Sequence, residues 1–341
     1  MTSIKLYTDY QGFASGDHFE AFQQFVDQHI DGNYFQSADF FSLSDAVDEF
    51  APILMLAINE NFEISGSLLG VFQSNGKGVK SWLSRRLIVL GGPLIKDTND
   101  NDTLCPLLDG LMNHASGRAI FIEFRNLFDL SQMQESFQSH GFQFQPYLNF
   151  LVKLDNESAV LKRMQGNKRR QITKSITSGA RIKEAESASE VKAFYQILKK
   201  LYEEKVKKPI PGIDLFLKGW EYGTGKLFVI SYSGKIIGGA FCPIFKDKVI
   251  YDWFRCGLKD VAPGVFAGVL AAWASIDYGL KNRFKHMDFM GAGQPDQPYG
   301  VRDFKAPFGG EMVSYGRFLT VINKPLYACG KWGLKIYQSL K

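Results

Sequence analysis

The sequence has few of the residues from which metal and redox sites are built. Its 341 residues include four cysteines and five histidines. The cysteines form no CxxC pair, and no histidine stands at metal-ligand spacing from another. We therefore expect no metal site, and we expect the cysteines to be buried free thiols, as in a reducing compartment.

Long apolar runs and an export signal are also missing. No stretch approaches the roughly 20 apolar residues that a membrane-spanning helix needs. Residues 1–20 lack the basic-then-apolar pattern of a signal peptide. A GxSxG elbow, a Walker loop and a GxGxxG following a strand are absent too. The missing apolar run and export signal predict a cytoplasmic protein. The missing motifs argue against the enzyme classes that contain them.

What the sequence does contain is a strand-rich unit that occurs twice. A hydrophobic content of 45% with 22% charged residues is typical of a well-packed globular protein, and 341 residues favour two domains or a duplicated unit. One passage begins with "ILMLAI" at residue 53 and the other with "LFVISY" at residue 227. Each continues as three strands, a helix and a fourth strand, in which tight turns indicate antiparallel pairing and the helix indicates a parallel crossover.

This order of elements resembles the central part of the GCN5-related N-acetyltransferase (GNAT) fold. We therefore expect an α/β protein of the α+β kind, made of tandem duplicated GNAT-like acyltransferase domains with mixed sheets flanked by helices. The first domain is expected to span residues 1–155. The second is expected to span 156–319, and residues 320–341 to pack back onto the first domain.

Positive charge is concentrated in one segment. Residues 162–208 carry a formal charge of +9, whereas the whole chain carries +5. The densest part, "KRMQGNKRRQITK", contains no acid. A cluster of one sign indicates a site for phosphates, and an exposed basic helix without a ligand is the alternative. The residues predicted to meet phosphates or tRNA are Lys168, Arg169, Arg170 and Lys174.

The most specific motif lies near the end of the chain. Residues 291–318 read "GAGQPDQPYGVRDFKAPFGGEMVSYGRF" and contain a Phe-Lys pair followed by Phe-Gly-Gly. This stretch resembles the signature of the Fem-type (FemABX) peptidyltransferases, which consist of two fused GNAT-like domains. "YFQSADFF" from residue 34 is similar to that family's F-x-Q-S-x-x-aromatic element, and "NKRRQITKSITSGARI" from residue 167 is similar to its basic segment. The resemblance spans about residues 34–320.

The resemblance implies an acyltransferase that moves an aminoacyl group from aminoacyl-tRNA to a free amine of a peptidoglycan precursor. Aminoacyl-tRNA would be a co-substrate, with no bound cofactor. The resemblance also implicates Lys305, in the Phe304–Lys305 pair, in stabilising the transition state. This suits the chemistry, because amine attack on an ester carbonyl builds an oxyanion that an ammonium group offsets. A surface lysine in a loop is the alternative, and the apolar neighbours of Lys305 favour a site.

Other residues are candidates with structural alternatives. Asp288 and Asp252 are candidate general bases, or carboxylates hydrogen-bonded at strand ends. Arg302 and Arg317 suit the phosphates or carboxylates of an acceptor, or form surface ion pairs. The Gly-Gly pair serves backbone conformation and close approach of substrate. The full set predicted to bind substrate is Gln36, Tyr299, Arg302, Gly309, Gly310, Tyr315 and Arg317.

Two departures from related enzymes bear on the donor. No stretch could form the long helical arm that is proposed to help hold tRNA in some Fem-type members. The acetyl-CoA pyrophosphate loop, R/Q-x-x-G-x-G/A, is also absent, and "APGVFAG" from residue 262 lacks its cation. Backbone amides there could still hold a phosphate at a helix N-terminus.

Two other functions therefore stay open. One is an acyl-CoA-dependent N-acyltransferase of the same fold that acts on an amino sugar or peptide. The other is a non-catalytic protein that binds nucleic acid or a lipid headgroup. The tail "NKPLYACGKWGLKIYQSLK" mixes apolar and basic residues, which also suits peripheral contact with the inner face of the membrane.

Overall fold

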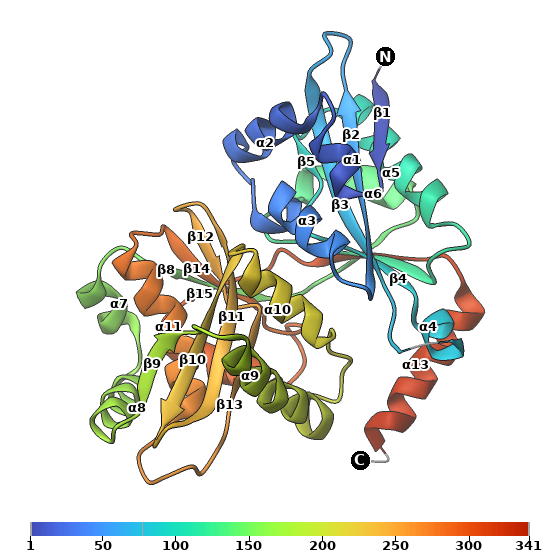
Figure 1. Ribbon diagram of the computed structural model, residues 1–341. Helices are drawn as coiled ribbons and strands as arrows, with labels where there is room; N and C mark the ends of the chain where they lie inside the picture. The colour runs from blue at the N-terminus through green and yellow to red at the C-terminus, as the bar shows by residue number, and fades with distance from the viewer. Residues whose placement is uncertain (1, 77, 340–341) are drawn as a thin grey trace. The chain divides into compact units, whose positions relative to one another are not determined.

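The computed structural model describes residues 2–76 and 78–339, apart from the side chains of Lys80 and of 334–339. It divides into two compact units, the first made of Met1–Pro146 with Tyr315–Lys341 and the second of Tyr147–Ser314. Each unit has its own eight-stranded mixed sheet flanked by helices (Figure 1). The predicted α/β class and the predicted duplication are therefore confirmed.

The sheet of the first unit runs in the order β1-β2-β3-β4-β6-β16-β7, with β5 beside β3. β4 and β6 pair in parallel across the α5 crossover, whereas the other pairs are antiparallel. The elements are β1 (Ser3–Tyr7), α1 (Tyr10–Ala14), α2 (Phe19–Gln28), η1 (Tyr34–Gln36), α3 (Ala38–Asp45), β2 (Phe50–Ile58), β3 (Ile64–Gln73), α4 (Val79–Ser84), β4 (Arg86–Leu90), β5 (Leu94–Ile95), α5 (Asn101–Ala115), β6 (Phe121–Arg125), η2 (Ser131–Met133), α6 (Gln134–Ser139), β7 (Gln143–Gln145), β16 (Arg317–Val321) and α13 (Lys324–Ser339).

The main core of the first unit lies between its sheet and the helices α5 and α6. Leu107 and Leu111 of α5 are fully buried there with Ile122 and Phe124 of β6. α1, α2 and α3 cover the other face of the sheet (Figure 1). Alternate strand residues point to opposite faces, so β2 and β3, covered on both sides, are buried along almost their whole length.

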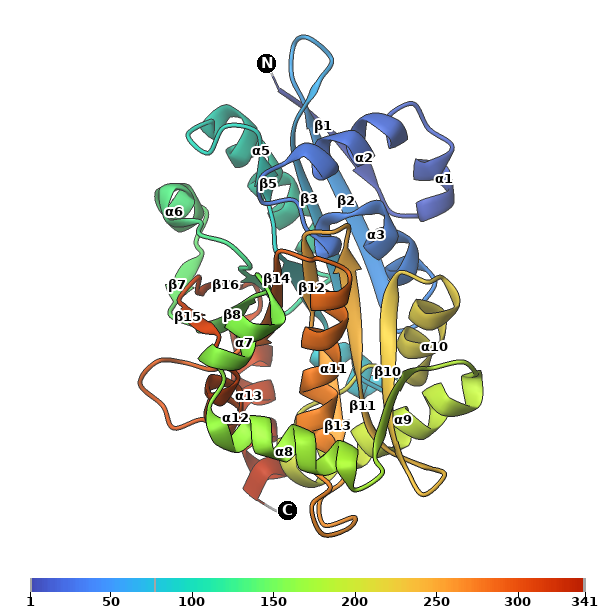
Figure 2. The ribbon, with the colours of Figure 1, turned by 90° about the vertical axis from the view of Figure 1, so that its left-hand side faces the viewer.

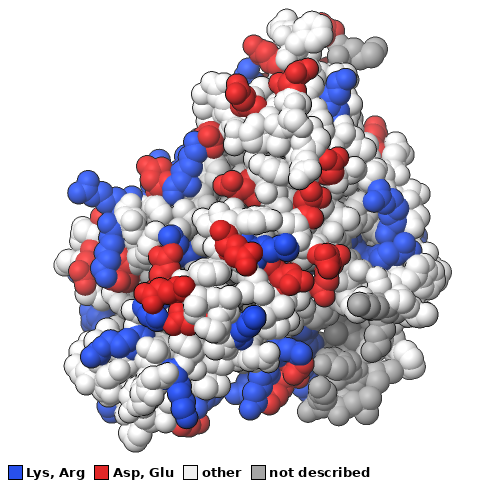
Figure 3. Space-filling view, in the orientation of Figure 1, with Lys and Arg blue, Asp and Glu red and all other residues white. Residues whose placement is uncertain are grey.

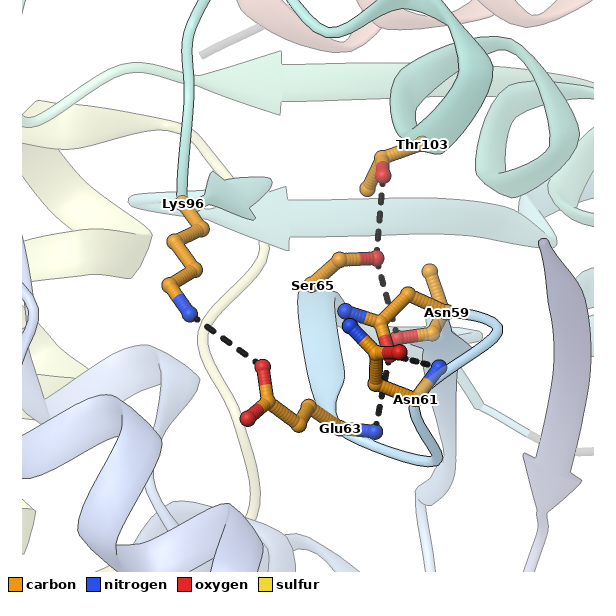
Figure 4. Close-up of polar contacts among 7 residues, drawn as sticks. Asn59, Asn61, Glu63, Ser65, Lys96 and Thr103 are labelled. Atoms are coloured by element: carbon orange, nitrogen blue, oxygen red, sulfur yellow. Dashed lines mark hydrogen bonds and ion pairs between the residues drawn. The ribbon is translucent and has the colours of Figure 1, made fainter.

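The turn between β2 and β3 is fixed by side chains. Asn59 Oδ1 accepts the backbone N–H groups of Asn61 (3.0 Å) and Glu63 (2.9 Å), which closes the turn (Figure 4). Glu63 also pairs with Lys96 at 3.5 Å, and the Thr103 hydroxyl donates to Ser65 Oγ at 2.9 Å. The last contact ties the start of α5 to β3.

The sheet of the second unit runs in the order β15-β8-β14-β12-β11-β10-β9, with β13 beside β11. Here β12 and β14 are the parallel pair, joined by the α11 crossover. The elements are β8 (Asn149–Lys153), α7 (Glu157–Arg163), α8 (Gly166–Thr177), β9 (Arg181–Glu184), α9 (Ala188–Leu201), the π-helix η3 (Tyr202–Val206), α10 (Ile213–Glu221), β10 (Gly225–Tyr232), β11 (Lys235–Phe245), β12 (Val249–Tyr251), β13 (Phe254–Gly257), α11 (Ala267–Lys281), β14 (His286–Gly291), α12 (Gly300–Lys305), η4 (Ala306–Phe308) and β15 (Glu311–Val313).

Helix α11 is the central helix of this unit. It packs against β10, β11 and β13, as Figure 2 shows, and most of its residues are buried. An all-round apolar sequence such as "GVLAAWASI" is typical of a helix enclosed on several sides. Helix α9 also packs against β11 and β13.

Several local features differ from the expected ones. In the first unit, the helix α4 precedes β4, the third of the expected strands. In the second unit, the third expected strand is divided into β12 and β13. Residues 301–318 contain the short helices α12 and η4. The cysteines are free thiols as expected, but only Cys242 and Cys256 are buried, whereas Cys105 is half-buried and Cys329 is exposed.

The units do not divide where the sequence suggested. β8, expected in the first domain, pairs with β14 in the second sheet, and Arg317–Leu319, expected in the second domain, belong to β16 of the first sheet. The reason is that the chain passes between the units twice. β8, which follows β7, belongs to the second sheet, and β16, which follows β15, belongs to the first. Within the described residues, no helix has both the length and the apolar character that crossing a membrane requires.

Candidate active site

The parallel strands β12 and β14 of the second unit separate at one point. They pair from Val249 with His286 to Tyr251 with Asp288. A last backbone bond runs from the Asp252 N–H to the Asp288 carbonyl oxygen at 2.9 Å. Beyond it, β13 pairs with β11, while β14 continues beside β8. Four ionisable side chains gather where the two strands separate.

Lys305 is the central member of this group. It ends α12 and is only 6% exposed. Its Nζ donates to the carbonyl oxygens of Phe289 (2.6 Å) and Gly291 (2.7 Å) at the end of β14. Burial, and next the charge of Arg255, lower the pKa of Lys305 to about 7, while Asp288 acts in the opposite direction. Lys305 is thus an ammonium group that loses its charge near neutral pH, and not the surface lysine of the alternative.

Asp288 is the nearest acid that titrates in the same range. It is 2% exposed, and its Oδ1 accepts the backbone N–H of Met290 at 2.6 Å. Burial raises the pKa of Asp288 to about 7, although the Met290 hydrogen bond and the charge of Lys305 lower it in part. An acid and a base with pKa values close to neutrality can exchange protons with a substrate at physiological pH.

A second buried acid stands beside the first. Asp252 is 5% exposed, and its Oδ2 accepts a hydrogen bond from Arg255. Among the described residues, its Oδ1 has no hydrogen-bond partner. An unpaired carboxylate oxygen in a buried site is costly, so Asp252 Oδ1 is available to accept a hydrogen bond from a bound molecule.

Phe304 lies between two cations. The guanidinium of Arg255 is 4.7 Å from its ring centroid and the Lys168 ammonium is 4.8 Å from it. Lys168 also lies 5.6 Å from the Phe308 ring. Such cation–π contacts stabilise by about 0.5–2 kcal/mol each. They connect the first turn of α8 to the helix that carries Lys305.

The other members of the basic segment lie on α8. Arg169 Nη1 donates to the Leu161 carbonyl oxygen at 2.8 Å, whereas Arg170 and Lys174 are exposed. Ser175 Oγ accepts the Phe266 N–H at 2.9 Å, so α8 caps the start of α11. On the face drawn in Figure 3, basic and acidic side chains are interspersed and do not form one continuous basic field.

Three predicted substrate residues of the second unit hold the loop itself. Arg302 donates to the carbonyl oxygens of Ala292 (3.0 Å), Gln294 and Pro295 (2.9 Å). Gly309 has φ +82°, and a Cβ there would lie 2.6 Å from the backbone of Arg163. A Cβ at Gly310 would lie 3.1 Å from the Leu151 carbonyl oxygen. These contacts position α12 and agree with a backbone role for the two glycines. Within the described part of the chain, Arg302 bonds carbonyl oxygens and does not form the surface ion pair of the alternative.

Tyr299 is the remaining predicted residue of this loop. It stands at the N-cap of α12, and a Cβ at Gly293 would lie 2.7 Å from its ring. The ring therefore packs on the loop that Arg302 also holds.

Three predicted substrate residues belong to the first unit. Arg317 of β16 pairs with Glu123 at 2.9 Å, and the Tyr315 carbonyl oxygen accepts a hydrogen bond from Asn126 at 2.8 Å. Gln36 is fully buried, and its amide bonds the backbone of Leu69 (2.8 and 3.0 Å) and Leu90 (2.8 Å). Gln36 therefore joins β3 to β4, a structural role in place of the expected substrate contact.

Solved structures share the fold of this chain, whereas the sequence comparisons found no match. No protein-family model and no curated protein sequence matches the chain. FemX superposes with a TM-score of 0.69 at 14% identity, over 96% of this chain and 99% of its own. The chain has a tandem GNAT fold.

Two further structures share this tandem GNAT fold. A tandem GNAT protein from the clavulanic acid biosynthesis pathway, in a form without AcCoA, gives a TM-score of 0.58 at 8% identity, covering 94% of this chain and 99% of its own. L-PGS from Bacillus licheniformis gives 0.59 at 13% identity, covering 93% and 96%. The duplication inferred from the sequence is thus the arrangement of known two-unit GNAT structures.

Sequence reasoning missed one residue of this candidate site, Arg255. Arg255 alternates with apolar residues in "FRCG" of β13, and an arginine at a strand position flanked by buried residues signals a paired charge. Among the described residues, no cluster of histidine, cysteine or acidic side chains is arranged to hold a metal ion.

Proposed function

We propose that this chain is a Fem-like aminoacyltransferase, which transfers an amino acid from aminoacyl-tRNA to an amine of a peptidoglycan precursor. The observation that carries the proposal is the buried ammonium of Lys305, in the Phe-Lys pair of the signature, where β12 and β14 separate. The likeness to FemX and to L-PGS supports the same broad class of reaction.

The reaction needs charge stabilisation and proton transfer. The acceptor amine attacks the ester carbonyl carbon, a C–N bond forms, and the C–O bond to the tRNA ribose breaks. Lys305 uses two of its three N–H donors on Phe289 and Gly291, so the third is directed to the oxyanion or to the departing ribose oxygen. Asp288 or Asp252 takes the proton that the attacking amine loses, and the ribose oxygen is protonated as it leaves.

The donor's phosphates are assigned to the basic segment. Lys168, Arg169, Arg170 and Lys174 lie on α8, and Lys168 also contacts the Phe304 ring. Phosphate contacts on α8 would thus be coupled to the position of the Phe304–Lys305 pair.

An acyl-CoA donor is the second candidate, because a tandem GNAT protein whose structure is described without AcCoA shares the fold. Three features favour tRNA over CoA. The start of α11 lacks the glycine-rich loop with its cation, and its Phe266 N–H is already bonded to Ser175. The stem of Lys174 also packs against Gly264 in this loop.

Peripheral contact with the inner face of the membrane is the third part of the proposal. α4 and α13 contact each other in the first unit and expose Val79, Trp82 and Trp332. Residues 74–96 and 324–341 contain lysine and arginine but no acid. Exposed tryptophans beside basic residues suit an anionic lipid surface.

The donor is tested by mass spectrometry of the acceptor. The protein is incubated with a nucleotide-linked muropeptide precursor and either charged tRNA or mixed acyl-CoAs, and Lys305→Met is assayed alongside. A residue-mass gain from tRNA that the variant loses supports the proposal. A gain from acyl-CoA alone assigns the chain to the acyl-CoA enzymes, and binding without transfer in both proteins favours the non-catalytic alternative.

A further inference from the structure

The first unit has a parallel strand pair that corresponds to the pair β12 and β14, at which Lys305 and its ionisable neighbours lie in the second unit. β6 follows α5 and pairs in parallel with β4, as β14 follows α11 and pairs with β12. Aligning "IEFR" of β6 with "MDFM" of β14 sets Glu123 at the position of Asp288. Each strand therefore carries an acid as its third residue. Where the parallel strands separate, the last backbone bond ends at Asp288 in the second unit and at Arg125 in the first, from the Gly91 N–H at 2.9 Å.

Glu123 is held between two arginines. Its Oε2 accepts a hydrogen bond from Arg125 Nε at 2.7 Å, and its Oε1 accepts one from Arg317 Nη1 at 2.9 Å. Burial alone would raise the pKa of Glu123, but Arg125 and Arg317 lower it to about 2. The carboxylate is thus permanently charged and fixes both guanidinium groups.

A third arginine lies on the same face of the sheet. Leu90 pairs with Arg125, and alternate strand residues point the same way, so Arg86 at the start of β4 shares this face. Burial, and next the charge of Arg125, lower the pKa of Arg86 to about 10. The negative charges of Glu123 and Glu49 raise the pKa of Arg86 in part, and Arg86 adds a third guanidinium group to this face of the sheet.

The guanidinium of Arg125 has N–H donors that are available to a ligand. Its side chain is 38% exposed. Apart from Nε, its nitrogen atoms make no hydrogen bond to any residue in the described part of the chain. The terminal nitrogens of a guanidinium form a planar fork that matches a carboxylate or a phosphate.

We propose that Arg125, oriented by Glu123 and flanked by Arg317 and Arg86, forms an oxyanion-binding site in the first unit. The ligand it would take is a carboxylate or phosphate group. The assignment of that group to the acceptor rests on the proposed function, because a peptidoglycan precursor carries groups of both kinds.

Titration calorimetry on the full chain, with no tRNA present, tests the site. The probes are inorganic pyrophosphate, for a phosphate source, and N-acetyl-D-alanyl-D-alanine, for a carboxylate source. We expect one of them to bind saturably, and Arg125→Gln to weaken it about tenfold to a hundredfold. Arg118→Gln, which removes a guanidinium of the same unit that lies over Phe72, serves as control and is expected to bind like the unaltered protein.

The outcomes separate this inference from the proposed function. Equal affinity in Arg125→Gln and the unaltered protein, or binding of neither probe, overturns the site. Weakened binding in Arg125→Gln establishes the site even if the protein transfers no amino acid, in which case the proposed function alone fails. If Arg125→Gln unfolds, Arg125→Lys keeps the charge without the fork, and an unchanged affinity there overturns the assignment.

Discussion

Glu123 in β6 and Asp288 in β14 are each the third residue of the strand that follows the crossover helix, yet they have opposite electrostatic properties. Two guanidiniums bond Glu123 directly and lower its pKa to about 2. Asp288 bonds a backbone N–H, and burial raises its pKa to about 7. The same strand position thus serves as a fixed counter-ion in one unit and as a group that titrates near neutrality in the other. Proton transfer is therefore expected in the second unit and charge recognition in the first.

The largest effect is expected from removing the Lys305 charge. Lys305→Met should lower kcat about a hundredfold to a thousandfold, because a buried donor that stabilises developing charge has no substitute. The melting temperature should stay the same or rise, since a buried ammonium is costly. Lys96→Met, in an exposed ion pair of the first unit, is the control, and a kcat in Lys305→Met within threefold of that control would remove Lys305 from the reaction.

The next prediction concerns pH. Lys305 must be charged to act, so the rate should fall as pH rises through about 7, where its pKa lies. Asp288 raises that pKa, so Asp288→Asn should move the alkaline limb of the pH–rate profile to lower pH. A profile that remains flat from pH 7 to 9 would contradict the assignment.

The next prediction concerns the contribution of Glu123 to the free energy of unfolding. The pKa of Glu123 falls from 4.5 to about 2 on folding, which corresponds to about 3 kcal/mol. Because the folded pKa is the lower one, this contribution is complete above about pH 4.5 and is lost as pH falls toward 2. Urea unfolding of Glu123→Gln should show the deficit at pH 7 and less than half of it at pH 3. Glu63→Gln, in the exposed pair with Lys96, should change stability by only about 0.5 kcal/mol, and an equal deficit in both variants would refute the comparison.

A smaller effect is expected on the basic segment of the second unit. Lys168→Gln removes the cation above Phe304 and should raise KM for the donor a few-fold while lowering the melting temperature slightly. Arg170→Gln, at an exposed position of α8, should reduce the salt dependence of KM with no change in stability. Identical behaviour of the two variants would argue against a link between α8 and the active site.

The smallest effect is expected at the surface of α4 and α13, for which we propose contact with lipid. Trp82→Ser with Trp332→Ser should reduce binding to vesicles of anionic phospholipid a few-fold in a sedimentation assay. Vesicles of neutral lipid are the control. Unchanged sedimentation of the double variant would refute peripheral contact through α4 and α13.

Local patterns in the sequence predicted most of the fold. Alternating apolar residues and tight turns predicted β2, β3, β10 and β11, and the matching order of elements predicted the duplication. Lys305 was found because it stands in a motif with apolar neighbours.

What sequence reasoning missed depends on contacts between distant residues. The role of Arg255 follows from Asp252 and Phe304, which no local pattern connects. Gln36 was assigned to substrate as part of the F-x-Q-S-x-x-aromatic element, whereas its bonds to Leu69 and Leu90 span 33 and 54 residues and follow from no local pattern. The division between the units was misplaced for the same reason, since β8 and β16 pair with strands far from them in the chain.

The position of β16 sets the order in which the chain can fold as it is synthesised. Residues 147–314 are contiguous, so the ribosome releases all of the second unit before β16 emerges. The first unit begins earlier but lacks Phe318, which stacks on Phe137 at 4.1 Å, and Arg317, the partner of Glu123. Domains that lie first in a chain usually fold first. Here the first unit must wait for β16, so the edge of β6 stays open until residues 317–321 have been synthesised.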